Sequence, residues 1–288
     1  MADLFKKTSI LFIWLTGLIF SQNISFKYLP NDLNFQPLRA NHQEARLGVL
    51  YFPNNGHLKV DIGNTVDLLQ FTFDSEIKLT CGIDFMAYAL STNYQGKRLQ
   101  IDAIDGFFGG NFSLTIPQDD GRFISRFRII HNSAHFVDGH WDEINDNWKD
   151  NLEPIPFTQD FGEITVGREK YFDQFGMKYY GAIAYATLVR PSVIKKYSFS
   201  SGLEINGSEI INPVFERKVN LFYAVHARLF GSPDYQLSVN NMLGIKFGNW
   251  REEGIVFYLS YYKGNSWYSE YYYNRVSKFG IGFFVEFI

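Results

Sequence analysis

The chain ends in the stretch Phe279-Gly280-Ile281-Gly282-Phe283-Phe284-Val285-Glu286-Phe287-Ile288. The odd positions from 279 to 287 carry large apolar side chains, and the even positions include two glycines and Glu286. Successive side chains of a β-strand point to opposite faces, so this alternation predicts a strand with one apolar and one polar face. One face then meets an apolar medium and the other a polar one.

The same alternation recurs along the chain and predicts an all-β protein. Twelve segments fit it, with boundaries uncertain by two to four residues: 44–52, 57–72, 75–91, 98–116, 122–134, 160–171, 175–190, 194–207, 215–231, 234–248, 252–262 and 276–288. An even number is usual for bacterial membrane barrels. We therefore predict a transmembrane antiparallel β-barrel of about 12 strands over residues 44–288. A secreted β-sandwich also alternates, but these strands are long and their apolar positions are rich in Phe, Leu, Val and Tyr.

The composition agrees with strands that face lipid on one side. The chain is 46% hydrophobic and 18% aromatic, with 29 Phe and 18 Tyr, yet its mean hydropathy is only −0.15. Apolar residues are therefore interleaved with polar ones, as in membrane strands. Aromatic clusters at 179–180, 261–262 and 267–273 fit interfacial girdles. The single cysteine, Cys81, excludes an internal disulfide, and a net charge of −3 gives no basic field for nucleic acid.

The N-terminus is typical of an exported protein. Lys6 and Lys7 precede an apolar run over 8–20, which is too short to span a bilayer, so residues 1–21 are predicted to be a signal peptide. Residues 22–43 are expected to form a periplasmic segment. The Phe-rich closing strand resembles the assembly signal of outer-membrane barrels. We therefore expect the protein in the outer membrane of a Gram-negative bacterium, with membrane lipids and the barrel assembly machinery as partners. The sequence does not predict the oligomeric state.

The fifth predicted strand carries the candidate chemistry. Its even positions include Arg126 and Arg128, which predicts that they face the lumen, whereas Phe127 and Ile129 predict a lipid-facing odd side. His131 and Ser133 share this odd, outward parity near the end of the strand.

The His131-Asn132-Ser133 stretch resembles the His-x-Ser pair of outer-membrane phospholipase A and of the lipid A deacylases. The resemblance implies that His131 is the base and Ser133 the nucleophile in the hydrolysis of an acyl ester. A third residue would orient the imidazole. Asp138 is a possible third member, and further candidates lie in the following loop and strand: Asp142, Glu143, Asn145, Asn147 and Glu163. The structural alternative is that both residues are solvated or hydrogen-bonded at the interface.

Other chemistry has weaker sequence support. His131, His135, Asp138, His140 and Asp142 are rich in metal-binding groups, but their spacing matches no zinc motif, so a metal site is left open. No cofactor is expected, apart from calcium if the protein is a hydrolase. Charges of both signs on the predicted lumen face indicate a closed lumen more than a pore: Arg122, Arg126, Arg128, Arg168, Arg228, Lys178, Lys218, Lys246, Glu76, Asp84, Asp102, Glu163, Glu169, Glu216 and Glu286.

Two stretches resemble the family called domain of unknown function 1207, whose members are exported bacterial barrel proteins. One is the Leu-Pro, Pro-Leu-x-Ala and Glu-x-Arg opening within 28–48, and the other is the Arg-x-Arg and His-x-Ser-x-His-x-x-Asp centre within 126–138. The family usually has Leu-Gly-Asp-Glu after the second His, where this chain has Phe136-Val137-Asp138-Gly139. The resemblance implies location and fold and leaves three functions open: a structural or partner-binding barrel, an outer-membrane lipid acyl hydrolase, and a narrow channel.

Overall fold

The C-terminal strand closes a barrel, as its alternation predicts. The structure is a computed structural model that describes residues 24–94, 98–136, 141–142, 144–214 and 216–287. Strand β15 (Arg275–Glu286) pairs antiparallel with β14 (Gly254–Asn265) on one side and with β2 (Leu47–Phe52), the first barrel strand, on the other. This pairing joins the two ends of the sheet, so that backbone groups which would be unpaired in lipid are hydrogen-bonded.

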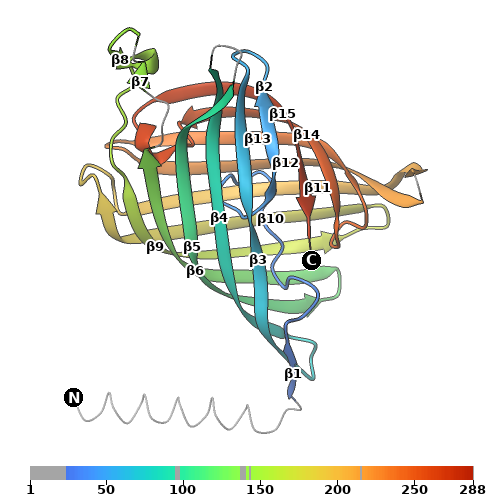
Figure 1. Ribbon diagram of the computed structural model, residues 1–288. Coiled ribbons are helices and arrows are strands. Elements are labelled where there is room, and N and C mark those ends of the chain that lie inside the picture. The colour runs from blue at the N-terminus through green and yellow to red at the C-terminus, as the bar shows by residue number, and fades with distance from the viewer. Residues whose placement is uncertain (1–23, 95–97, 137–140, 143, 215, 288) are drawn as a thin grey trace, which may run out of the picture.

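Twelve antiparallel strands make the closed barrel, which confirms the predicted fold class. Besides β2, β14 and β15, they are β3 (His57–Phe73), β4 (Lys78–Tyr94), β5 (Arg98–Gln118), β6 (Gly121–Phe136), β9 (Thr158–Tyr171), β10 (Phe175–Arg190), β11 (Tyr197–Val214), β12 (Arg217–Gly231) and β13 (Tyr235–Phe247). Figure 1 shows β3–β6 crossing the strands of the opposite wall at a steep angle, as expected for strongly tilted strands.

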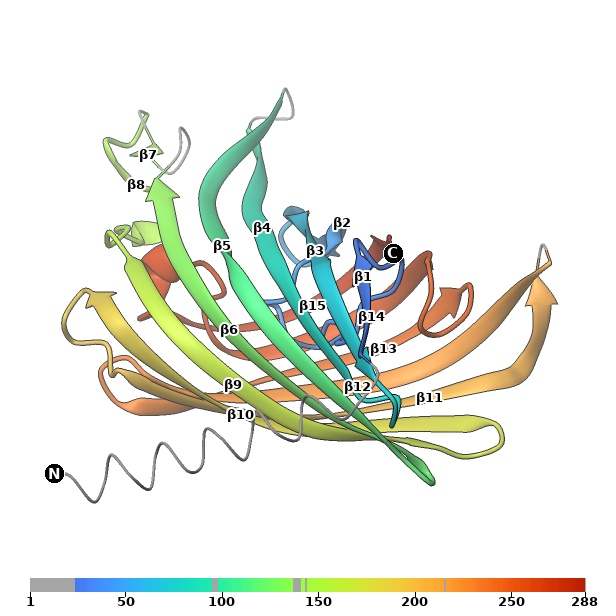
Figure 2. The ribbon, with the colours of Figure 1, turned by 90° about the horizontal axis from the view of Figure 1, so that it is seen from below.

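The smaller elements are β1 (Ile24–Tyr28), the short pair β7 (Trp141–Asp142) and β8 (Asn147–Trp148), and the 3₁₀ turns η1 (Lys149–Asn151) and η2 (Ser269–Tyr271). Strand β1 pairs with the last residues of β3, 69–73. Strand β2 pairs with the first residues of β3, 57–61. Figure 2 shows β1 alongside β3 from below. Among the described residues, no helix is long and apolar enough to cross a membrane.

The two ends of the barrel differ. At one end, here called the turn end, short turns join the strands, for example at 74–77, 119–120 and 172–174. At the opposite loop end lie the longer connections from β6 to β9 and from β14 to β15, and the β7–β8 pair projects beyond the rim (Figure 1). Short turns on one side and long loops on the other are the usual asymmetry of outer-membrane barrels.

The two faces of the strands follow the predicted parity. Large apolar side chains are exposed on the outside, including Phe85, Phe112, Ile129, Leu243 and Phe283. Inward positions of the same strands are buried. A continuous apolar exterior of this kind is unstable in water and fits the acyl chains of a bilayer.

Residues 30–46 fill the barrel interior and are called the plug below. Their side chains and backbone contact residues of strands around the whole barrel, including Ser113 of β5, Glu204 of β11 and Asn240 of β13. Leu38 and Ala40 are each 1% exposed. The structure thus places most of the expected periplasmic segment, 22–43, inside the barrel. The predicted signal peptide, 1–21, lies outside the described residues.

One expectation about aromatic residues is wrong. The cluster at 267–273 was expected to form an interfacial girdle, but Trp267, Tyr268 and Tyr271 are between 3% and 6% exposed. They belong to the loop between β14 and β15, which folds inward over the loop end of the lumen and packs on its core. Tyr179 and Tyr261, in contrast, are exposed on the outer wall and fit a girdle position.

Candidate functional site

Strand β6 presents opposite chemistry on its two faces. Arg126 and Arg128 are buried on the lumen side, whereas Phe127 and Ile129 are exposed on the outside. His131 follows Ile129 at the next outward position, towards the loop end. The predicted parity is therefore correct, and His131 stands on the outer wall at the edge of the exposed apolar surface.

A carboxylate from the neighbouring strand holds the His131 ring. Asp160 of β9 is the cross-strand partner of His131, and its Oδ1 lies 2.5 Å from Nδ1 of the imidazole. The two side chains are 36% and 42% exposed. An ionised carboxylate only accepts hydrogen bonds, so Nδ1 carries the proton and Nε2 is left as the basic nitrogen.

An apolar ring supports the other side of this pair. The ring centroids of Phe108 and His131 are 4.9 Å apart, and Phe108 of β5 is itself exposed on the outer wall. Backbone pairing with both neighbours fixes His131 between β5 and β9. The imidazole is thus oriented by a carboxylate and an aromatic ring before any substrate arrives.

Ser133 lies on the same outward side, two residues further towards the loop end. The register pairs it with Gly106 of β5 and Thr158 of β9. Residues two apart on a strand share a face and stand roughly 7 Å apart, so His131 and Ser133 are neighbours on the outer wall. The structure brings His131, Ser133 and Asp160 to one patch of the outer wall.

Two of the other proposed orienting residues, Glu163 and Asp142, have their partners away from this patch. Glu163 faces the lumen, where its Oε1 accepts a hydrogen bond from Arg128 Nε at 2.8 Å. Asp142 accepts hydrogen bonds from Ile144 and Asn145 within its own loop, which lower the pKa of its carboxyl. Asp138 lies outside the described residues.

The lumen face carries a second, buried set of charges. Arg126 makes two hydrogen bonds to the Glu44 carboxylate of the plug, with distances of 2.8 Å and 2.5 Å. Both side chains are no more than 2% exposed. Burial alone would raise the pKa of Glu44, but the nearby Arg126 and Arg128 lower it to about 2. Glu44 is therefore a permanent anion in the lumen.

Further along the plug, Arg39 joins two strands and the turn between β13 and β14. Its guanidinium pairs with Glu286 of β15 at 2.8 Å and lies 3.9 Å from the centre of the Trp250 ring, while its backbone N–H donates to Glu204 of β11. Plug and wall therefore have complementary charges. Cavities of about 20, 30 and 40 Å³ border the plug, and a larger one of about 200 Å³ lies beside its first residues near the turn end.

Three of the predicted lumen charges need correction at the turn end, where Glu76 and Glu216 are exposed turn residues. Arg168 does not face the lumen: it pairs with Asp120 at the turn end, and both side chains are at least 35% exposed. Its neighbour Glu169 takes the inward position and bonds Arg122. Adjacent strand residues point to opposite sides, so only one of the two can face the lumen.

In the described part of the chain, no three His, Cys, Asp or Glu side chains are grouped so that they could hold a metal ion. His140 and Asp138, which belong to the His- and Asp-rich stretch, lie outside the described residues.

Asp160 and Glu44 are the important residues that the sequence reasoning missed. Asp160 had a detectable signal, because it shares the parity of Ile164 and Val166, which are outward, and an acidic residue on a lipid-facing side is unusual. Glu44 gave no such signal, because nothing local shows that the segment before the barrel turns back inside it.

The fold resembles several solved outer-membrane structures at low sequence identity. The toluene transporter TodX of Pseudomonas putida is 11% identical, with a TM-score of 0.43, over 80% of this chain and 69% of that chain. The monoaromatic hydrocarbon channel CymD is 8% identical, with a TM-score of 0.41, over 90% and 95%. The β domain of the Bordetella autotransporter BrkA is 10% identical, with a TM-score of 0.41, over 83% and 96%.

No curated protein matches the chain. A family model does match, over residues 61–287, which run from β3 to the closing strand. The match confirms the resemblance noted in the sequence, and the chain belongs to the family described as protein of unknown function (DUF1207).

Proposed function

We propose that this protein is an outer-membrane acyl hydrolase that cleaves ester-linked acyl chains of membrane lipids at Ser133, His131 and Asp160. The observation that carries the proposal is the 2.5 Å contact between His131 and Asp160 on the outer wall. Ionisable side chains on a lipid-facing surface are costly and are functional candidates by default. This pair sits beside a serine at the edge of the apolar exterior, where a lipid ester would lie.

The chemistry needs no group beyond these side chains and water. His131 Nε2 takes the proton from the Ser133 hydroxyl, and the oxygen attacks the ester carbonyl carbon. The protonated imidazole then gives its proton to the leaving alcohol, and the acyl group stays on Ser133. Water, deprotonated by His131, attacks the acyl carbonyl, and the imidazolium returns its proton to the Ser133 oxygen as the fatty acid leaves. Asp160 holds the Nδ1–H tautomer and stabilises the imidazolium that forms in each half-reaction.

The location of the site favours a lipid over a soluble ester. Its apolar border is made of Phe108 and Ile129, which are 55% and 58% exposed. An acyl chain lying against this surface delivers its ester to the polar rim above it. We propose calcium as an aid to the reaction, because a hard cation near the developing oxyanion stabilises it.

The plug disfavours the channel alternative. Residues 33–44 occupy the lumen with buried side chains, and their charges are paired with those of the wall. A solute would have to displace this segment and separate buried ion pairs. The structural or partner-binding alternative remains compatible with the fold, but it gives no reason for a His–Asp pair on the outer wall.

The test uses the purified full-length chain in detergent micelles with phospholipid and lipid A substrates, with and without calcium. We expect ester turnover and labelling of Ser133 by a fluorophosphonate probe. Ser133→Ala should abolish both. Asp160→Asn should lower turnover by on the order of 10²–10⁴-fold, because the imidazole loses its orienting carboxylate.

Ser125→Ala is the matched control. Ser125 lies on the same strand with the same parity, eight positions nearer the turn end, and bonds the backbone oxygen of Thr165. This variant should keep full turnover. Absence of turnover and labelling in a parent protein that shows heat-modifiable, folded migration on gels would rule out the hydrolase and leave the pair with a structural role.

A further inference from the structure

A second site lies at the loop end, apart from the outer-wall pair. A cavity of about 640 Å³ opens between β4, β5, the loop before β9 and the loop that joins β14 to β15. Its volume falls in the range of about 300–1,000 Å³ that is typical of small-molecule sites. Nothing in the proposed hydrolysis uses it.

One wall of the cavity is aromatic and preformed. Trp267 stacks on Phe52, with ring centroids 5.3 Å apart, and Tyr88 Oη donates a hydrogen bond to the Trp267 backbone oxygen at 2.9 Å. Asp105 accepts a hydrogen bond from the Ser269 N–H at 2.8 Å. The loop that supplies this wall is therefore fixed to the strands beneath it.

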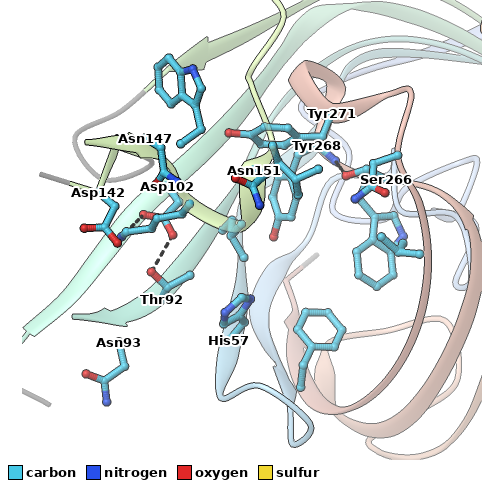
Figure 3. A pocket seen from close by; sticks show the side chains of 18 of the residues that line it. His57, Thr92, Asn93, Asp102, Asp142, Asn147, Asn151, Ser266, Tyr268 and Tyr271 are labelled. Carbon is cyan, nitrogen blue, oxygen red and sulfur yellow. Dashed lines mark hydrogen bonds and ion pairs between the residues drawn. The ribbon is translucent and has the colours of Figure 1, made fainter. Parts of the chain in front are cut away.

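The facing wall is polar. Figure 3 shows Thr92 and Asp102 on the side opposite Ser266 and Tyr268, with the Thr92 hydroxyl bonded to the Asp102 carboxylate. Asparagine side chains are unusually frequent in the lining: Asn93, Asn145, Asn147, Asn151 and Asn274. Each primary amide both donates and accepts hydrogen bonds without carrying charge.

The charges of the lining cancel. Two carboxylates, Asp102 and Asp142, stand against two ammonium groups, Lys149 and Lys278, and Lys149 is 3.6 Å from Asp102. The lining thus offers no net charge to attract an ion of either sign. An uncharged ligand with many hydrogen-bonding groups is the better match.

One buried donor in the cavity wall is unsatisfied. The indole Nε1 of Trp267 has no hydrogen-bond partner within the part of the chain that the structure describes, and the residue is only 5% exposed. A buried N–H without an acceptor costs roughly as much as a lost hydrogen bond. Because this nitrogen has almost no accessible surface, the indole offers a ligand its ring and not its N–H.

From these features we infer that the cavity binds a saccharide of one or two pyranose units. The apolar face of a sugar ring packs on the aromatic wall, while its hydroxyls exchange hydrogen bonds with the amides and Thr92. Free sugars at the cell surface and the sugars of a surface glycolipid share this chemistry.

The test titrates the full-length protein in detergent with three soluble probes and one glycolipid: maltose, lactose, N,N′-diacetylchitobiose and rough lipopolysaccharide. Binding is followed by calorimetry and by tryptophan fluorescence. We expect at least one saccharide probe to bind saturably. Binding of the soluble sugars indicates a free ligand, and binding of lipopolysaccharide alone indicates a glycolipid source.

Two variants locate the site. Trp267→Phe shrinks the aromatic surface that a sugar ring would cover, and Asn147→Ala removes an amide. Each should weaken binding about 3- to 10-fold, because the first loses part of the stacking surface and the second loses one hydrogen bond. Asn54→Ala, an exposed asparagine in the turn between β2 and β3 at the same end and outside the cavity, should bind as the parent does.

Ser133→Ala should also bind as the parent does, which separates this site from the proposed hydrolase. The inference fails if none of the four probes binds, if phenol binds while the saccharides do not, or if Trp267→Phe and Asn147→Ala leave the affinity unchanged.

Discussion

Two of the charged contacts of strand β6, one on each face, differ in burial and in the number of hydrogen bonds. On its inner face, Arg126 and Glu44 are almost fully buried and joined by two hydrogen bonds. On its outer face, His131 and Asp160 are more than one-third exposed and joined by one. The inner pair ties the plug to the wall, so it has a structural task. The outer pair links β6 and β9, which are already joined by backbone hydrogen bonds along their length, so the fold does not need it.

The difference teaches where to look for function in a barrel. A buried pair whose members are both satisfied holds the structure together, and removing one member leaves a bare charge in the lumen. A half-exposed pair contributes little to stability and has to be explained in another way. The predictions below separate the two pairs, from the largest expected effect to the smallest.

The inner pair should give the largest loss of stability. Arg126→Ala strands the Glu44 carboxylate inside the lumen and should lower the free energy of unfolding by about 3–5 kcal/mol. Urea unfolding in detergent, followed by tryptophan fluorescence, measures the loss. The double variant Arg126→Met/Glu44→Leu removes both charges and should recover most of it. An equal loss in the double variant would mean that packing rather than charge holds the plug.

Arginine substitutions on the outer face of β6 test whether this wall lies in the membrane. Phe127→Arg should cost about 2–4 kcal/mol if this exposed position lies near the middle of the bilayer, whereas Phe123→Arg, close to the turn end, should cost about 0–1 kcal/mol. Folding into lipid vesicles, read by urea titration, gives both values. Equal costs at the two positions would argue that the wall between them has no lipid-depth gradient.

At the loop end, Glu270 should make the stability of the protein depend on pH. Burial raises the pKa of Glu270 to about 7, and its Oε2 is buried with no partner among the described residues. The carboxyl binds its proton more tightly in the folded state, so stability falls as the pH rises from about 4.5 to about 7. Glu270→Gln should raise the melting temperature at pH 8 and leave it unchanged at pH 4. A melting temperature that the substitution lowers at pH 8 would reveal a partner that needs the anion.

The outer pair should give the smallest stability effect. Replacing both members, as His131→Phe/Asp160→Val, should change the free energy of unfolding by no more than about 1 kcal/mol, because the pair is half-exposed and the new residues suit a lipid-facing wall. The same variant should lose all ester turnover. A loss of several kcal/mol would instead place this pair with the inner one, as a structural element.

Much of the barrel was predictable because its signal is local. The predicted strand at 175–190 has the observed bounds of β10 and that at 57–72 ends one residue before β3, since burial on one face and lipid on the other imposes alternation at each residue. The outward direction of His131 followed from the same rule. The buried place of Tyr268 could not follow, because a loop residue has no alternating neighbours to set its direction.

The sequence by itself determined the strands, their two faces and the closure of the barrel by the last segment, because strand parity depends only on neighbouring residues. Tertiary structure decided what meets across those faces. Asp160 reaches His131 only because β9 pairs with β6 in one register across a long loop. Glu44 reaches Arg126 across 82 residues because the plug turns back into a lumen that exists only after the barrel closes. Such contacts depend on chain closure, which local side-chain chemistry does not encode.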